Sequence, residues 1–534
     1  MDAPQPAQLP KRQLSVATVV FMIFCLCAAG AYGIEDMIPQ SGPGLTLVML
    51  FVLPFLWSTP MALVAAELGS ALPEEGGFYK WVQRACGEFW GFQAGWWRTL
   101  SIYFDNTIYV VLAGSYVASV VEMTAMESYL FKATIIIFFT YINLRGIQDV
   151  GVASSILSIV VMAAFALVAA VGFANWQTNP FVPFTPPDQS LLQSIGAGIA
   201  IGVWMYAGYE SMSTVAGELK DPQVIPKATL ISVPLIMAAY ILPTMGGIAS
   251  LGSWTDWSSD NGVSYGDVVG EVAPALGVAF VMVAVLAQFS VFNAYIASGS
   301  RGFFALAADN LAPKTLAKVS EKTGVPYVAV LSLGVFSLIM CMFPFETIVI
   351  IDVMLLISAY VLIFVAACII RIKEPSLNRP FKIPVGAAGL IAMCVPPVII
   401  AFGVLFTSGA DYLLAGMIGL LSGPIAYVGF RKTYGGLSKS DPERYPANPA
   451  TGLRYGDLFR LFFFCAGLAT IGAVALVFLP GFEDPAYYAE EYGLPGLLDA
   501  ILRVLRWFTG ALAVAALLLL IGAVAIDRKP AGER

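Results

Sequence analysis

The sequence predicts an all-α protein that crosses a membrane many times. Of its 534 residues, 58% are hydrophobic and 12% are charged, whereas a soluble globular chain carries about 25% charged residues. The apolar residues fall into runs long enough to span a bilayer, which takes roughly 18 to 25 residues per helix. Lys and Arg lie mainly between alternate runs. These three observations together predict a polytopic membrane protein.

The same composition argues against several classes of function. The chain has a net charge of −7 and no basic stripe, so we expect no nucleic-acid partner. It has no histidine, and neither a Cys/His metal spacing nor a glycine-rich phosphate loop followed by Lys is present. We therefore expect no enzyme, no metal and no cofactor. Six of the seven cysteines sit inside apolar runs, which favours membrane packing over disulfides.

The first apolar run, 14–39, breaks in its middle. An unbroken apolar stretch up to position 27 is followed by a segment with Gly30 and Gly33, and then by Glu35 and Asp36. Glycines loosen a helix, and bare carboxylates are costly at membrane depth unless they face water, a partner or a ligand. A spanning helix interrupted by glycines beside an acid is typical of a transporter's substrate site. We place Asp36 at the outer mouth.

Counting the apolar runs in order predicts fourteen spans. The tail 1–13 has no small-residue cleavage site after a short apolar core, so we expect no removable signal peptide. An even number of spans places both ends on one side. The predicted spans are 14–39, 45–70, 89–120, 129–146, 149–174, 191–216, 227–251, 272–300, 326–343, 347–371, 386–407, 411–430, 458–480 and 507–527.

Charge predicts which side the ends occupy. Of the 28 Lys and Arg, 24 lie in the tails and alternate loops. By the positive-inside rule, both termini are cytoplasmic. The acidic loop 481–499 then faces outward. We expect a multi-pass protein of the inner or plasma membrane.

The sixth span, 191–216, repeats the pattern of the first. Its apolar start leads into Ala207, Gly208, Tyr209 and Glu210, so a glycine and an acid again lie inside a span. Spans one and six are five apart, as expected if helices 1–5 and 6–10 are inverted copies. Tyr209 either packs or closes over a bound amine through a cation–π contact.

Three acids, Glu35, Asp105 and Glu210, fall within or near the predicted membrane. Inserting each acid at the centre of a membrane helix costs about 2.5 to 3.5 kcal/mol. We therefore expect the three acids to line a polar cavity, to pair with a partner or to lie near the membrane interface. Asp105 belongs to a stripe on the third span, whose members are spaced by four: Trp97, Ser101, Asp105 and Tyr109. Arg98 is the one basic candidate partner inside a span.

Other polar residues leave alternatives open. Glu67 and Glu218 are read as cytoplasmic caps or gates. Serines on the fifth and eighth spans, with Asn293, offer either packing contacts or a sodium site.

An ordered series of motifs resembles the amino acid–polyamine–organocation superfamily, closest to its polyamine-uptake and L-type amino acid transporter branch. The matching pieces span about 14–430 and read YGIED at 32–36, AELG at 66–69, PEEGGFY at 73–79, FWGFQAGW at 89–96, DN at 105–106, NLRG at 143–146, AGE at 216–218, DP at 221–222, PKA at 226–228, GVPY at 324–327 and NRPFKIPV at 378–385.

This resemblance implies a LeuT-type 5+5 inverted-repeat core with broken helices 1 and 6, which works by alternating access. It implies that half-helix dipoles near the breaks hold the substrate backbone, and that three acids bind amines. The substrate-binding residues implied are Ala29, Gly30, Tyr32, Gly33, Glu35, Asp105, Ala207, Gly208, Tyr209 and Glu210. The chain departs from the branch at Tyr295 and Ile363, where the branch carries acids.

We therefore predict a cytoplasmic tail 1–13, a twelve-helix transporter core 14–430, a cytoplasmic loop 431–457, two additional transmembrane helices 458–527 and a cytoplasmic tail 528–534.

The predicted function is a permease for amino acids or polyamines, with proton-coupled import. A carboxylate in a cavity serves as the proton carrier. An exchanger of neutral or cationic amino acids is the alternative, and a channel or a non-transporting amine sensor is the alternative from another class. The predicted partners of the protein are a small amine or amino acid and the lipid bilayer, and a homodimer is left open.

Overall fold

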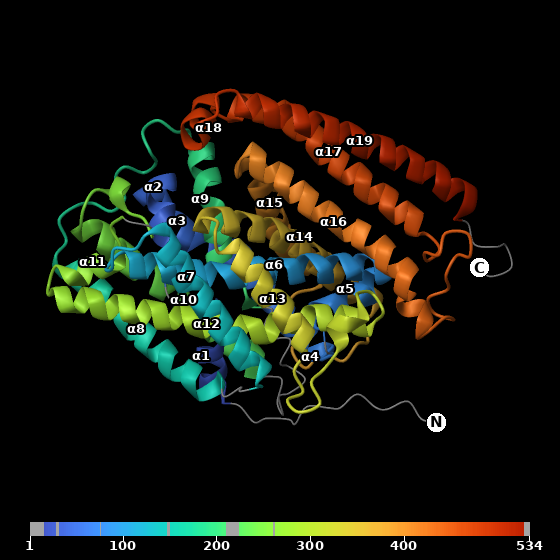
Figure 1. Cartoon of the computed structure of the whole chain (residues 1–534), viewed down its shortest axis with the longest axis horizontal. Helices are drawn as coiled ribbons and strands as arrows, with labels where there is room; N and C mark the ends of the chain where they lie inside the picture. Colours follow the sequence, from blue (N-terminus) through green and yellow to red (C-terminus); the bar gives the residue numbers. More distant parts are fainter. Residues whose placement is uncertain are drawn as a thin grey trace.

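A computed structural model describes residues 15–27, 31–74, 76–146, 150–209, 224–259 and 262–527, and these are almost entirely helical (Figure 1). The α-helices are α1 (Val16–Cys27), α2 (Ile34–Ser41), α3 (Pro43–Leu53), α4 (Thr59–Ala71), α5 (Phe78–Cys86), α6 (Glu88–Ala118), α7 (Ala125–Leu144), α8 (Val150–Ala174), α9 (Leu191–Met205), α10 (Val224–Ser250), α11 (Tyr265–Gly270), α12 (Pro274–Ala308), α13 (Tyr327–Met340), α14 (Phe345–Lys373), α15 (Ala387–Thr407), α16 (Ala410–Tyr434), α17 (Asp457–Phe482), α18 (Pro485–Tyr492) and α19 (Leu497–Ile526). The π-helical turn η1 (Pro54–Ser58) joins α3 to α4.

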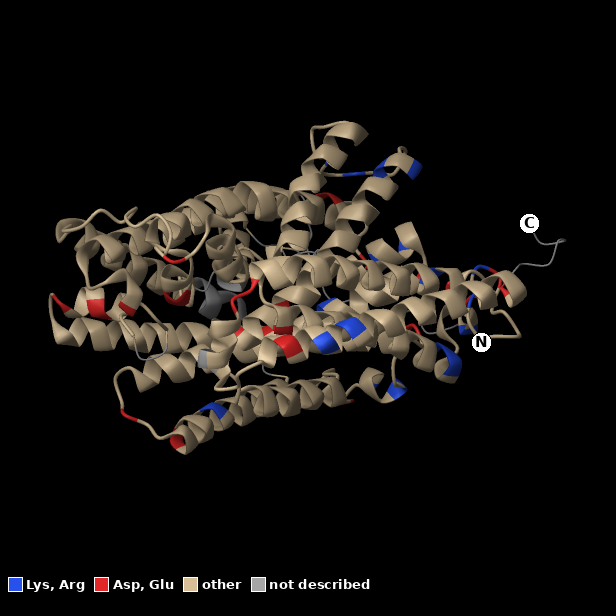
Figure 2. Ribbon diagram, turned by 90° about the horizontal axis from the view of Figure 1, so that it is seen from above, with Lys and Arg blue, Asp and Glu red and all other residues tan. Residues whose placement is uncertain are grey.

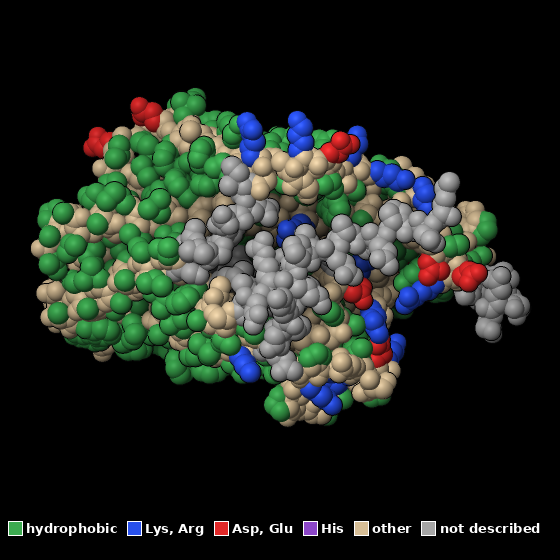
Figure 3. Space-filling model, turned by 90° about the horizontal axis from the view of Figure 1, so that it is seen from below, with side chains coloured by type: hydrophobic (Ala, Val, Ile, Leu, Met, Phe, Trp, Pro, Cys, Tyr) green, Lys and Arg blue, Asp and Glu red, His purple; other side chains and the backbone are tan. Residues whose placement is uncertain are grey.

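Ten helices in the described part of the chain are long and apolar enough to cross a membrane. Large apolar side chains are exposed on them in numbers that a water-soluble surface does not tolerate. Figure 3 shows one such face, with hydrophobic side chains over much of it and Lys and Arg gathered elsewhere. The prediction of an all-helical, multi-pass membrane protein is thus confirmed. The count of fourteen spans and the inverted repeat stay predictions.

Helix α6 is the central element, since it packs against α5, α7, α12, α13, α14 and α16 (Figure 1). Its middle carries Arg98, Ser101, Asp105 and Asn106, and all four side chains are buried. Buried polar groups need partners. A helix that carries these four residues into the centre of the bundle therefore positions a polar site there.

The helices predicted to be interrupted do end within their spans. Helix α1 ends at Cys27, and α2 begins at Ile34 after Gly33, whose φ of 90° lies in the left-handed region that favours glycine. A Cβ at this position would lie 2.7 Å from the ring of Phe345. Helix α9 ends at Met205, and Gly208 has a φ of 100°. Ala29, Gly30 and Glu210 lie outside the described residues.

Lys and Arg concentrate toward one end of the long helices (Figure 2), which we call the basic end. Glu67, near the end of α4, is buried there between Arg371 and Arg379. It also accepts a hydrogen bond of 2.8 Å from the backbone N–H of Ile383. Every one of these contacts crosses between distant segments, so Glu67 joins α4 to α14 and to the loop that follows α14.

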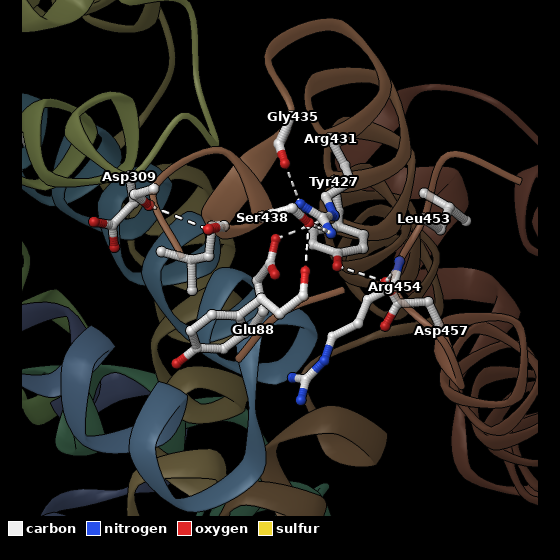
Figure 4. A network of polar contacts seen from close by, with 12 residues as sticks. Glu88, Asp309, Tyr427, Arg431, Gly435, Ser438, Leu453, Arg454 and Asp457 are labelled. Atoms are coloured by element: carbon white, nitrogen blue, oxygen red, sulfur yellow. Dashed lines mark hydrogen bonds and ion pairs between the residues drawn. The ribbon is translucent and has the colours of Figure 1, made fainter. Parts of the chain in front are cut away.

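Helices α17 and α19 pack against each other along the outside of the bundle (Figure 1), and a buried polar network ties them to it (Figure 4). Arg431 of α16 lies 3.2 Å from Glu88 of α6, and neither side chain is exposed. Tyr427 of α16 donates a hydrogen bond of 2.6 Å to Asp457 at the start of α17. The two additional helices are thus fastened to α16, and through α16 to α6.

Candidate functional site

A small cavity of about 20 Å³ lies where α6, α9, α10, α12 and α14 meet, next to the last residue of α1. Both interrupted helices therefore end at this cavity. It is lined by Cys27, Arg98, Asp105, Tyr109, Trp204, Met205, Ala207, Tyr240, Tyr295, Asp352 and Leu356. Its volume is that of about one water molecule, so a larger molecule enters only when the walls move.

A larger groove lies elsewhere, between α9 and the outer face of α17. Its walls are mainly apolar side chains such as Leu192, Val474, Val477 and Phe478. None of the described residues that line it is charged. We therefore place the candidate binding site in the small central cavity.

Asp105 is the carboxylate in the best position to meet a cation in this cavity. Its side chain is 5% exposed, and Trp204 Nε1 donates a hydrogen bond of 3.0 Å to it. The ring of Tyr109 lies 5.4 Å from that of Tyr295 and 6.1 Å from that of Trp204. A carboxylate among three aromatic rings suits an ammonium group, because charge attraction and cation–π contacts act on it together.

A second carboxylate, Asp352 of α14, lines the same cavity and is 1% exposed. Ser101 Oγ donates a hydrogen bond of 2.5 Å to Asp352 Oδ1, and Arg98 Nη1 donates one of 2.9 Å to Ser101 Oγ. Arg98 was predicted to be a candidate partner for acids inside the membrane, and in the structure it is linked through Ser101 to Asp352. Sequence reasoning missed Asp352, although it is the sole acid within the predicted span 347–371.

Glu35 lies apart from this cavity. It is fully buried and accepts hydrogen bonds from the Gly33 N–H at 2.8 Å and from the Tyr116 hydroxyl at 2.7 Å. Tyr116 follows Asp105 by eleven positions, which is roughly 16 Å along α6. The ring of Tyr32 packs at 5.3 Å from that of Tyr116. The structure therefore does not bring Glu35 and Tyr32 together with Asp105.

Of the predicted residues that follow α9 and that the structure describes, one lines the cavity and two lie outside its lining. Ala207 lines the cavity. The backbone N–H of Gly208 donates a hydrogen bond of 3.3 Å to the Tyr360 hydroxyl, while Tyr209 is buried next to it and is not part of the lining. Among the predicted residues that the structure describes, Asp105 and Ala207 share the cavity.

The fold and this cavity define a multi-pass helical membrane protein with a charged site where two interrupted helices end. The sequence family described as "Amino acid permease" matches residues 14–421. The chain therefore belongs to the amino acid permease family, which confirms the resemblance to the amino acid–polyamine–organocation superfamily. The matched family and its relatives are transporters, so the expectation of no enzyme is also confirmed.

Relatives that are named for different substrates resemble the chain. A probable polyamine transporter of Arabidopsis thaliana is 31% identical over 442 residues, which cover 78% of this chain and 85% of that protein. The branched-chain amino acid permease BcaP of Bacillus subtilis is 29% identical over 392 residues, covering 68% and 79%. The crystal structure of MhsT in complex with L-phenylalanine has a TM-score of 0.50 at 14% identity and covers 78% of this chain and 100% of that chain. That likeness concerns the fold alone, and it agrees with a LeuT-type architecture.

Proposed function

We propose that the protein is a secondary active transporter that moves amino acids or polyamines across the membrane by alternating access, with proton-coupled import. The observation that carries this proposal is the buried carboxylate of Asp105 among the rings of Tyr109, Trp204 and Tyr295. The ammonium of the substrate lies against this carboxylate. Ala207, at the end of α9, contributes to the wall.

The remaining predicted residues complete the proposed site. The substrate backbone lies against the helix breaks at Ala29, Gly30, Gly33 and Gly208, where half-helix dipoles favour its charged groups. Tyr209 closes the site. Glu210 adds negative charge around it, whereas Glu35, which lies apart from the cavity and accepts a hydrogen bond from the Gly33 N–H, supports the break in the first span together with Tyr32.

Protons are the proposed coupling ion. The chain has no histidine, and we propose a carboxylate as the proton carrier because Asp105 and Asp352 lie in the cavity. We propose that both termini are cytoplasmic in the inner or plasma membrane, since Lys and Arg concentrate at one end of the helices (Figure 2). A homodimer is compatible with the exposed apolar surface of α19.

Exchange of neutral or cationic amino acids is the second candidate, and it is favoured by the cavity's Arg98, which offers a cation to a substrate carboxylate. The two candidates differ in what drives transport. An exchanger needs substrate on both sides of the membrane, whereas a symporter needs a proton gradient.

Uptake into proteoliposomes tests the proposal. We expect an inward proton gradient to drive accumulation of labelled putrescine, arginine or leucine, and the two unlabelled compounds to compete with the one that is taken up. Collapse of the gradient with a protonophore should abolish accumulation. Uptake that needs internal substrate and ignores the gradient would establish exchange, and no uptake of any of the three would contradict the proposal.

A further inference from the structure

Two carboxylates and one guanidinium line the central cavity. Arg98, Asp105 and Asp352 are 1%, 5% and 1% exposed. No other Lys, Arg, Asp or Glu among the described residues lines it. With all three side chains ionised, the cavity therefore carries one net negative charge.

A chain of two hydrogen bonds links the cation to Asp352. Arg98 donates to Ser101 at 2.9 Å, and Ser101 donates to Asp352 at 2.5 Å. Asp105 accepts a hydrogen bond of 3.0 Å from a neutral donor, Trp204 Nε1, and also interacts with Tyr109, Tyr295 and the charge of Arg98. The one guanidinium of the cavity therefore acts on both carboxylates, Asp352 through Ser101 and Asp105 through its charge, which leaves one negative charge of the set for a ligand.

We propose that Arg98 sets the number of positive charges that the cavity accepts at one. The guanidinium occupies, as part of the chain, the place that the second ammonium of a diamine would need in order to reach Asp352. The ligand is then an amine that brings a single ammonium into the cavity. This inference rests on the proposed function, because it assumes that an amine binds beside Asp105.

The physical reason is the cost of unbalanced charge in a water-poor interior. Buried ions are stable only when they are paired and hydrogen-bonded. One ammonium neutralises the single excess negative charge beside Asp105. A second ammonium would leave the cavity with a net positive charge next to a fixed arginine, so the diamine should bind less well than a monoamine of the same length.

Paired ligands and charge-balanced variants test the inference. The ligands are n-butylamine and 1,4-diaminobutane, which share a four-carbon chain and differ by one ammonium. Their dissociation constants are measured on the purified full-length protein in nanodiscs by calorimetry. The variants are Arg98→Gln, Asp352→Asn, the double variant that carries both, and Arg98→Lys, which keeps the charge.

We expect Arg98→Gln to shift the affinity ratio about tenfold or more toward the diamine, because it releases Asp352 to bind a second ammonium. The double variant restores one net negative charge, so its ratio should return close to that of the natural protein. Arg98→Lys should leave the ratio near its starting value. A ratio that Arg98→Gln does not move, or that the double variant does not restore, overturns the inference.

A stability measurement separates this inference from the proposed function. If neither amine binds any variant although all are folded, the assumption that an amine binds beside Asp105 has failed, and uptake of arginine or leucine then decides whether the proposed function fails with it. The charge balance is then read from thermal unfolding. We expect Arg98→Gln to lower the unfolding temperature and Asp352→Asn to recover at least part of that loss in the double variant. Additive losses in the double variant would show that Arg98 does not balance Asp352.

Discussion

At the scale of single residues, the polar side chains buried inside the bundle define the candidate site. The four-residue spacing on the third span predicted that Ser101, Asp105 and Tyr109 share a face, and in the structure Asp105 and Tyr109 line the cavity while Ser101 hydrogen-bonds to Asp352. Helical periodicity makes such a stripe visible in sequence. The pairing of Ser101 with Asp352 joins positions 251 apart, and no local pattern encodes it.

Asp105→Asn tests the charge of the cavity with little change in shape. Because the amide oxygen can still accept the hydrogen bond from Trp204, the substitution removes the negative charge and keeps that contact. We expect the affinity for a cationic amine to fall by about 1.5 to 3 kcal/mol, measured by equilibrium binding.

Trp204→Phe is the matched control, since it removes the N–H donor and keeps an aromatic ring beside Tyr109. Its effect on amine affinity should be smaller than that of Asp105→Asn. Equal affinities in the natural protein and in Asp105→Asn would contradict a direct ion pair between this carboxylate and the amine.

At the scale of helices, glycines next to acids predicted where the first and sixth spans break. The observed ends at Cys27 and Met205, with left-handed Gly33 and Gly208, lie at these glycine-containing segments. What the sequence did not reveal is how helices are joined across the bundle. Glu67 and Arg371 are 304 positions apart, and which arginine meets which acid depends on the packed fold.

Glu67→Gln should destabilise the protein strongly. The substitution removes the carboxylate that Arg371 and Arg379 share, in a site where their side chains are 5% and 3% exposed. Breaking a buried ion pair by removing one partner costs about 3 to 5 kcal/mol, so we expect a clearly lower unfolding temperature in detergent.

The control is Arg84→Gln, which breaks the pair with Glu374 at the same end of the bundle. In this pair the two side chains are 38% and 31% exposed, and exposed pairs contribute about 0 to 1 kcal/mol. The arginine holds the pKa of Glu374 below its usual value. Similar losses in Glu67→Gln and Arg84→Gln would contradict a special role for the buried cluster.

At the scale of the whole molecule, composition predicted a multi-pass helical protein and the motifs predicted its family, and both are confirmed. The attachment of the last two helices was outside the reach of sequence reasoning. Their apolar faces predict membrane residence, whereas the contacts that fix them come from single polar residues such as Asp457 and Tyr488. Such contacts become visible only when the partner segments are in place.

The end of the molecule opposite the basic end should respond to pH through Glu483, which directly follows α17. Burial raises its pKa to about 7, opposed by the hydrogen bond from Tyr488 and assisted by the nearby charge of Asp411. The folded state therefore holds this proton more tightly than the unfolded chain. Its contribution to stability is complete below the ordinary pKa of a glutamate and is lost as the pH rises through about 7.

We expect Glu483→Gln to remove this part of the pH dependence. Unfolding temperatures of the natural protein should fall between pH 5 and pH 8 more than those of the variant do, because the amide does not ionise. Asp484→Asn, one position further along and exposed, is the control and should follow the natural protein. Parallel curves for the natural protein and Glu483→Gln would contradict the assignment.

The joining of α6 to α16 limits how the molecule changes shape. Besides the pairing of Glu88 with Arg431, the indole N–H groups of Trp96 and Trp97 donate to Ser422 Oγ and to the Leu420 carbonyl at 2.9 and 3.0 Å. Because α6 and α16 are joined at one end and again along their length, they cannot move apart without breaking buried contacts. Asp105 on α6 therefore belongs to the same packed unit as α16 and the helices attached to α16. If the protein transports as proposed, we expect the displacement that admits a substrate to occur at the wall of the cavity where α1 and α9 end.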